Sequence, residues 1–329
     1  MKKTVKRILV GSGAVAAGIA AIGALSYAVT DYMVGVALDR DHPKQNSQKA
    51  RTVLTGSSRL VEFARLMEDF AEKLTTVDCK TVRIIAEDST ELVGHLRIAP
   101  NAKRTILAMH GWRSSWAKDF GMIADFWHQN DCNVLYAEQR AQGESGGEYM
   151  GFGMLERHDC LSWIHYLNET GFEKLPIYLG GVSMGASTVL MSAEFDLPQN
   201  VKGIIADCGF TSAEAIWKHV ARKNMHLTYT GLRAAAVNDL CRRKINMGAS
   251  DCSTVEAVAK SRVPILFIHG ADDRFVPVEM TYENYKACAS SKRLLIVPGA
   301  DHGMSYYIDQ IAYESAMIDF WKNCEAAVS

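Results

Sequence analysis

Two G-x-S-x-G patterns are the first residues in the sequence whose types and spacing suit chemistry. Gly181-Val182-Ser183-Met184-Gly185 directly follows an apolar strand expected at Ile177 to Gly180 and directly precedes a run with helical preference. A tight strand-to-helix turn exposes a serine hydroxyl, and the helix N-terminus favours negative charge beside it. The second match, at Gly143 to Gly147, lies in a loop with no helix start after it. We therefore expect Ser183 to be a nucleophile and Ser145 to be a turn residue.

A serine nucleophile needs a base, and the base needs an acid that orients it. Two later segments with the pattern of a buried strand each end just before side chains of these types. His302 follows the second segment and is the expected base. Asp273 follows the first and is the preferred acid, with Asp272 as the alternative and Asp207 as a weaker third candidate. The other histidines have ordinary structural explanations; His269, for example, ends a strand.

Short apolar stretches alternate with helical patterns from Val77 onward, and such alternation positions catalytic loops at one edge of a sheet. The expected strands are Thr81 to Ala86, Leu92 to Ile98, Thr105 to His110, Asn133 to Ala137, Ile177 to Gly180, Gly203 to Asp207, Ile265 to His269 and Leu294 to Val297. The expected helices include Glu156 to Asn168, Met184 to Glu194, Glu279 to Ala287 and Ser305 to Asn323. This pattern predicts a mostly parallel, eight-stranded sheet with helices on both faces and a leading antiparallel pair. The alternation stops between Thr211 and Lys260, where we expect a small helical cap.

Five placed motifs make the chain similar to the α/β-hydrolase superfamily over about Val77 to Asn323. The motifs are His110-Gly111-Trp112, Arg140 to Ser145, the Ser183 turn, Asp273 to Pro277 and the loop that holds His302. Within the superfamily the chain resembles bacterial membrane-anchored serine hydrolases with small caps, described as esterase-like or serine-aminopeptidase-like. The resemblance implies the α/β-hydrolase fold and an oxyanion hole formed by the backbone N–H groups of Met184 and Trp112. Such donors stabilise the negative oxygen that forms when a hydroxyl attacks a carbonyl.

These residues together predict a serine hydrolase that cleaves a carboxylic ester through a Ser183-His302-Asp273 triad and an acyl-enzyme intermediate. The expected substrate is a small-molecule or lipid-like acyl ester, and the residues that bind it are not indicated. A peptidase, amidase or acyltransferase on the same triad is the alternative. A non-enzymatic scaffold with a hydrolase fold is a remote alternative, because no member of the triad is missing. The mechanism requires no metal or organic cofactor.

The N-terminal segment has the pattern of a membrane anchor. Four lysine and arginine residues precede Ile8 to Val29, 22 residues without a charge, which span about 33 Å as a helix. Ser26-Tyr27-Ala28 offers small residues at a possible cleavage site, so a removed secretory signal is the alternative. The basic flank favours a single-pass protein with a cytoplasmic N-terminus and an extracytoplasmic catalytic domain, or a secreted protein after cleavage.

These patterns divide the chain into three parts. Residues 1–30 form the anchor or signal segment, residues 31–76 a polar linker and an amphipathic helix, and residues 77–329 the hydrolase domain with a cap at about 211–260. Apolar side chains recur at helical spacing from Leu60 to Leu74, which predicts the amphipathic helix.

Composition excludes one class of function. The chain has 36 Lys and Arg against 37 Asp and Glu, so its net charge is -1 and no global basic field attracts a nucleic-acid partner. Eight cysteines are spread along the chain with no C-x-x-C motif, and their spacing does not indicate a metal site. We expect most of them to be small buried apolar side chains, with disulfides as the alternative in an extracytoplasmic domain.

Overall fold

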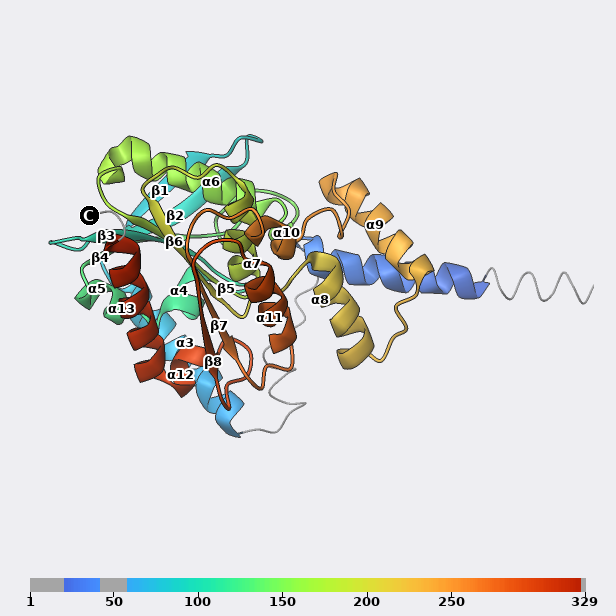
Figure 1. Ribbon diagram of the computed structural model, residues 1–329. Coiled ribbons are helices and arrows are strands. Elements are labelled where there is room, and N and C mark those ends of the chain that lie inside the picture. Colours follow the sequence, from blue (N-terminus) through green and yellow to red (C-terminus); the bar gives the residue numbers. More distant parts are fainter. Residues whose placement is uncertain (1–20, 42–57, 327–329) are drawn as a thin grey trace, which may run out of the picture.

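The structure is a computed structural model that describes residues 21–41 and 58–326. A sheet with helices on both faces forms the body of the molecule (Figure 1). An N-terminal helix (Ala21–Leu38) extends away from this body beside helices of the cap region. The basic N-terminal residues, the first part of the apolar segment and most of the expected linker lie outside the described residues.

A single sheet runs through the body in the strand order β1-β2-β4-β3-β5-β6-β7-β8. Its strands are β1 (Lys80–Ile85), β2 (Glu91–Arg97), β3 (Arg104–Met109), β4 (Cys132–Ala137), β5 (Ile177–Val182), β6 (Val201–Asp207), β7 (Ile265–Gly270) and β8 (Lys292–Val297). β2 pairs antiparallel with β1 and β4, and the other five neighbouring pairs are parallel. The sequence predicted this sheet because strands buried on both faces appear as apolar runs.

Helices cover both faces of the sheet and build two core layers. The α-helices after the N-terminal one are α3 (Ser58–Thr75), α4 (Trp116–Phe120), α5 (Ala124–Gln129), α6 (Glu156–Leu167), α7 (Met184–Met191), α8 (Ala213–His219), α9 (Gly231–Ile245), α10 (Thr254–Val258), α11 (Val278–Ala287), α12 (Ser305–Ile308) and α13 (Gln310–Ala326). Of these, α8 and α9 belong to the cap region and lie away from the sheet. On one face Trp163 of α6 and Leu190 of α7 pack against the strands. On the other face, Phe120 of α4, Trp127 of α5 and Phe320 of α13 pack against the strands. The α/β-hydrolase fold expected from the sequence is confirmed.

The C-terminal helical region differs from the prediction of one helix from Ser305 to Asn323. The structure divides it at Asp309, whose backbone angles, φ -141° and ψ 75°, are not helical. The carboxylate of Asp309 accepts a hydrogen bond from the backbone N–H of Ala312 at 3.0 Å, so it caps the start of α13. The apolar pattern continues across the break and therefore hides it in the sequence.

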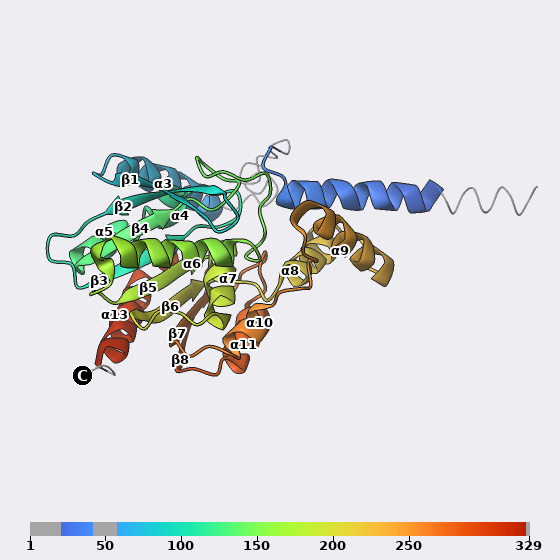
Figure 2. The ribbon, with the colours of Figure 1, turned by 90° about the horizontal axis from the view of Figure 1, so that it is seen from above.

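The N-terminal helix continues to Leu38, past the boundary expected at residue 30. Its last two turns are buried in the molecule, where Val34 and Leu38 belong to the same apolar cluster as Val237 and Leu240 of α9. Figure 2 shows α9 lying beside this helix at the end of the molecule remote from α13. The cap region therefore packs against the N-terminal helix as well as against Met184 and Met191 of α7.

Candidate active site

Ser183 lies in the turn that joins β5 to α7. Its backbone angles, φ 56° and ψ -116°, are rare for a residue other than glycine. A Cβ atom on Gly185 would lie 1.8 Å from the carbonyl oxygen of Met109, and one on Gly181 would lie 2.3 Å from that of Gly185. Only glycine fits at both positions, so the G-x-S-x-G spacing permits the close packing that presents the serine hydroxyl.

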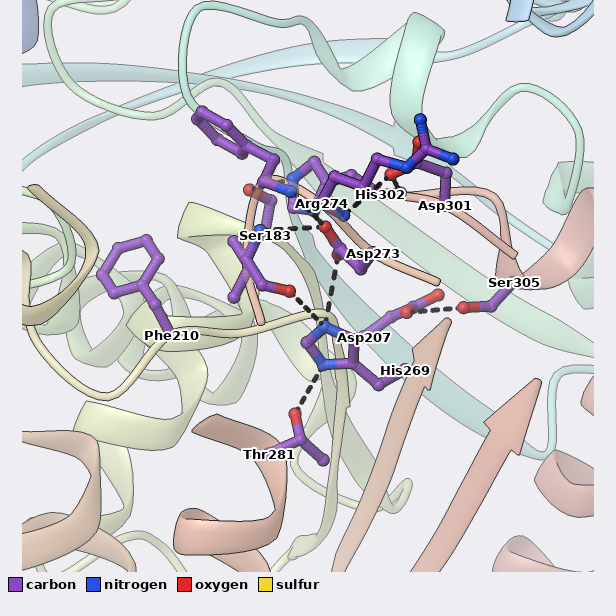
Figure 3. Close-up of polar contacts among 12 residues, drawn as sticks. Ser183, Asp207, Phe210, His269, Asp273, Arg274, Thr281, Asp301, His302 and Ser305 are labelled. Atoms are coloured by element: carbon purple, nitrogen blue, oxygen red, sulfur yellow. Dashed lines mark hydrogen bonds and ion pairs between the residues drawn. The ribbon is translucent and has the colours of Figure 1, made fainter. Parts of the chain in front are cut away.

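The side chains of Ser183, His302 and Asp273 meet beyond the carboxyl ends of their strands (Figure 3). Nε2 of His302 lies 2.9 Å from Oγ of Ser183, and Nδ1 lies 2.7 Å from Oδ2 of Asp273. The carboxylate of Asp301 accepts from the backbone N–H groups of Arg274 and His302, at 3.1 and 2.8 Å, and so joins the two loops. In this arrangement the imidazole can take the proton of the hydroxyl while the carboxylate holds its other nitrogen.

The Asp273 carboxylate is surrounded by donors. Oδ1 accepts from the backbone N–H groups of Phe275 and Val276, at 2.9 and 2.8 Å. Oδ2 faces His302 and also Nε2 of His269, at 3.2 Å. Burial alone would raise the pKa of Asp273, but the charge of His302 and the hydrogen bonds from both histidines lower it well below its usual range. The carboxyl group therefore stays ionised and can stabilise an imidazolium.

His269 is a member of this cluster that the sequence did not single out as functional. Its side chain is fully buried at the end of β7. Nδ1 lies 2.6 Å from the hydroxyl of Thr281, and Nε2 lies 2.9 Å from the carbonyl oxygen of Val276. Burial alone would lower the pKa of His269, but the hydrogen bond with Asp273 and the charge of that carboxylate raise it. His269 therefore holds the Asp273 carboxylate from the side opposite to His302.

The other acid and serine candidates from the sequence lie elsewhere. Asp272 is exposed. Asp207 accepts from Ser305 through its carboxylate, at 3.1 Å, and burial raises its pKa. Its backbone carbonyl accepts from the N–H of Ser183 at 2.8 Å, so it supports the turn rather than the imidazole. Oγ of Ser145 donates to the carbonyl oxygen of Glu138 at 2.6 Å, which fits the expected structural role.

The loop between β3 and α4 lies directly beside the serine. A Cβ atom placed on Gly111 would be 3.4 Å from Cβ of Ser183. The backbone N–H of Gly111 donates to the Asp119 carboxylate at 2.6 Å, and the hydroxyl of Ser114 donates to the same group at 2.5 Å. Met184 is the first residue of α7, where a backbone N–H has no acceptor within the helix. The two residues expected to form the oxyanion hole, Trp112 and Met184, thus belong to segments that flank the serine.

A cavity of about 1120 Å³ opens onto Ser183 and His302. The helix α3, which the sequence predicted as an amphipathic packing helix, forms part of its wall. The wall residues of α3 are Leu60, Phe63, Ala64 and Met67. An apolar wall next to a nucleophile suits the hydrocarbon part of a substrate.

One group of side chains near the site has donor types that metals bind. Cys208, Asp273 and His302 place one potential ligand atom each within 4.8 Å of one another. Asp273 and His302 already hydrogen-bond to each other, and burial raises the pKa of the Cys208 thiol well above its usual value. Because metals bind the thiolate, this environment does not favour a metal ion. All eight cysteines are unpaired in the structure, and seven of them are buried.

A family model matches residues 118–327, and its description is the prolyl oligopeptidase family. The chain belongs to the prolyl oligopeptidase family. It has the α/β-hydrolase fold, as the sequence predicted. Among curated proteins it is 30% identical to YqkD of Bacillus subtilis over 192 residues, 58% of this chain and 62% of YqkD. The match thus spans less than two thirds of that relative. It is 21% identical to YfhR of Escherichia coli K12, over 73% of this chain and 80% of YfhR.

Solved structures show the same fold at lower sequence identity. The Pyrococcus furiosus esterase Pf2001 has a TM-score of 0.63 at 22% identity, over 76% of this chain and 93% of that chain. Est1E of Butyrivibrio proteoclasticus, solved with ferulic acid, has a TM-score of 0.57 at 18% identity, over 73% and 99%. The Exiguobacterium antarcticum esterase has a TM-score of 0.55 at 16% identity, over 74% and 100%.

Proposed function

We propose that this protein hydrolyses carboxylic esters through Ser183 as nucleophile, His302 as base and Asp273 as the orienting acid. The observation that carries the proposal is the continuous chain of short contacts from Oγ of Ser183 through both nitrogens of His302 to the Asp273 carboxylate. The low pKa of Asp273 supports it, because an ionised carboxylate is what stabilises the imidazolium.

The reaction has two steps. Nε2 of His302 takes the hydroxyl proton as Oγ of Ser183 bonds to the carbonyl carbon, and the negative oxygen accepts hydrogen bonds from the backbone N–H groups of Met184 and Trp112. The C–O bond to the alcohol then breaks as His302 gives the proton to the leaving oxygen, which leaves an acyl group on Ser183. Water repeats the sequence on the acyl-enzyme: its proton goes to His302, its oxygen bonds to carbon, and Ser183 is released.

One observation favours an ester over an amide substrate: solved proteins of similar fold are named esterases. The α3 side of the cavity is apolar and suits the acyl chain of either substrate. The second candidate function is peptide or amide hydrolysis, which the name of the matching family favours. Acyl transfer would use the same acyl-enzyme as ester hydrolysis, but an acceptor other than water would attack it.

Labelling with a fluorophosphonate tests the nucleophile. Wild type should be labelled, Ser183→Ala should not, and Ser145→Ala, which changes the other G-x-S-x-G serine, should retain labelling once circular dichroism shows that it is folded. Labelling of Ser183→Ala equal to that of wild type would exclude this serine as the nucleophile.

A panel of matched substrates tests the bond. Acyl groups of increasing length are presented as p-nitrophenyl esters and as p-nitroanilides, with peptide p-nitroanilides added. We expect turnover of the esters with a preference for acyl chains long enough to reach α3. A higher kcat/KM for anilides or peptides would favour the peptidase alternative.

The proposed location is a membrane, with an uncleaved single-pass anchor and an extracytoplasmic catalytic domain. The N-terminal helix is long and apolar enough to span a bilayer by length and composition, which a signal sequence also satisfies. Contacts on both sides of Ala28 support the uncleaved form: the guanidinium of Arg233 donates to Ser26 at 3.3 Å, and Val34 is buried in the domain. Mass spectrometry of the protein after cell fractionation distinguishes the two cases. A full-length protein in the membrane fraction indicates an anchor, and a shortened protein in the soluble fraction indicates a removed signal.

A further inference from the structure

The helix α9 runs parallel to the N-terminal helix and is fixed to it near both ends. Close to its start, Arg233 donates to Oγ of Ser26 at 3.3 Å. Close to its end, Nζ of Lys244 donates to the carboxylate of Asp39 at 2.7 Å. Figures 1 and 2 both show the two helices side by side. The position of the N-terminal helix in a bilayer therefore sets the position of α9.

The contact with Ser26 places the start of α9 at the edge of the expected membrane segment. The expected membrane segment Ile8 to Val29 ends three residues beyond Ser26. With a rise of about 1.5 Å per residue, the Arg233 contact lies roughly 5 Å inside the end of that segment. The first turn of α9 and the loop before it thus reach the level where lipid headgroups meet acyl chains.

This end of the cap exposes side chains that suit such a position. Leu232, in the first turn of α9, is 86% exposed, and Met225, in the preceding loop, is 46% exposed. Arg222 and Lys223 are exposed on the helical turn Val220–Asn224 that directly precedes Met225, and no salt bridge is found for them within the described residues. Apolar side chains flanked by cations are typical of surfaces that lie in a bilayer interface with anionic lipids.

We propose that residues 222–232 of the cap dock into the surface of an anionic lipid bilayer, with Met225 and Leu232 among the acyl chains and Arg222 and Lys223 at the headgroups. The proposal goes beyond ester hydrolysis and rests on the membrane anchor proposed above. Asn224, the last residue of the helical turn that carries Arg222 and Lys223, lines the cavity that opens onto Ser183. The lipid-facing segment is thus also a wall of the candidate active site, which gives an amphipathic ester a short route from the bilayer.

Fluorescence quenching by lipids tests the docking. The full chain carries Cys79→Ser, since Cys79 is the one cysteine that is not buried. A single cysteine, labelled with an environment-sensitive dye, replaces Leu232 in one variant and Ile311 in a second; Ile311 is 84% exposed on α13 and is the matched control. A third variant carries the dye at Ile22, which is 72% exposed on the N-terminal helix and reports insertion of the anchor. Each is reconstituted in phosphatidylglycerol–phosphatidylcholine vesicles with and without phosphatidylcholine that carries a doxyl group near its headgroup.

Quenching at position 232 comparable with that at position 22, and little at position 311, would support the proposal. Arg222→Glu combined with Lys223→Glu should then reduce quenching at 232 and leave quenching at 22 unchanged. Quenching at 232 no greater than at 311 would overturn the proposal, as would absence of quenching at 22. Shielding of the dye at 232 from water without quenching would also overturn it, because a second copy of the chain would then cover this surface. None of these readings depends on ester hydrolysis, so the proposed function is tested separately.

Discussion

The indole N–H of Trp112 donates to the carbonyl oxygen of Ala37 at 2.9 Å. The next residue, Arg113, donates to the carbonyl oxygens of Val36 and Asp39 at 2.9 and 2.6 Å. Carbonyl groups in the last turn of a helix have no partner within the helix, so the candidate oxyanion loop satisfies the end of the N-terminal helix. Through these hydrogen bonds, the end of the expected membrane helix helps to hold the candidate oxyanion loop in place.

Trp112→Phe tests this support, because it removes the indole donor and keeps an aromatic ring. We expect kcat to fall about threefold to tenfold, the effect of one hydrogen bond of about 1 kcal/mol, with KM little changed. Trp217→Phe is the matched control, since the buried Nε1 of Trp217 has no hydrogen-bond partner among the described residues. Equal kinetics of the two variants would show that the Ala37 contact does not position the loop.

Gly185→Ala tests the packing of the serine turn. The added Cβ atom would lie 1.8 Å from the carbonyl oxygen of Met109, so the turn must move. We expect a destabilisation of about 3 kcal/mol or more and loss of fluorophosphonate labelling. Gly180→Ala in the same strand is the control, because its Cβ atom would meet nothing closer than 3.5 Å. Urea unfolding and labelling of both variants give the comparison, and a Gly185→Ala protein with wild-type labelling would contradict it.

The parts of the site that sequence predicted depend on local patterns. Ser183, Asp273 and His302 each follow the end of a strand within a few residues, so the strand pattern places them at one edge of a parallel sheet. That inference uses only each residue and the strand that directly precedes it in the sequence.

The parts that sequence did not predict depend on contacts between distant segments. Asp119 supports the Gly111 backbone from α4, a helix of five residues that is too short to leave a periodic signal. Whether His269 faces a carboxylate depends on how the Asp273 loop folds back, and the sequence shows only that it ends a strand. The pairing of Trp112 with Ala37 joins residues 75 positions apart, for which neither side chain carries a local signal.

His269→Gln tests the second support of the Asp273 carboxylate. The variant removes the imidazole that lies 3.2 Å from Oδ2, while the backbone donors of Phe275 and Val276 remain. Because a small displacement of a catalytic group is costly, we expect kcat to fall about tenfold or more with an unchanged KM. His165→Gln, on the surface of α6, should match wild type. Steady-state kinetics on a p-nitrophenyl ester decide the point, and an unchanged kcat in His269→Gln would reject the supporting role.

Ala64→Phe tests whether α3 contacts the acyl chain. The larger side chain would project into the cavity from its apolar wall. We expect the ratio of kcat/KM for long-chain to short-chain esters to fall about tenfold, since filling a pocket by a few carbon atoms discriminates at that level. Val61→Phe is the control, because Val61 is on the exposed face of the same helix. A chain-length profile of Ala64→Phe identical to that of Val61→Phe would place the acyl group elsewhere.

The low pKa of Asp273 predicts a particular pH dependence of stability. A carboxyl group whose pKa is lower in the folded state stabilises that state above its unfolded pKa, about 3.9, and this contribution is lost as the pH falls towards the folded value. The difference in free energy of unfolding between wild type and Asp273→Asn should therefore shrink as the pH falls below about 4. It should also fall as the pH rises above about 6.5, the unfolded pKa of histidine, because Asp273 raises the folded pKa of His269. Urea unfolding at a series of pH values measures it, with Asp272→Asn as the control for an exposed carboxylate in the same loop. A difference that stays constant down to pH 3 would mean that the folded state does not favour the ionised form of Asp273, and the charge assigned to the candidate triad would be wrong.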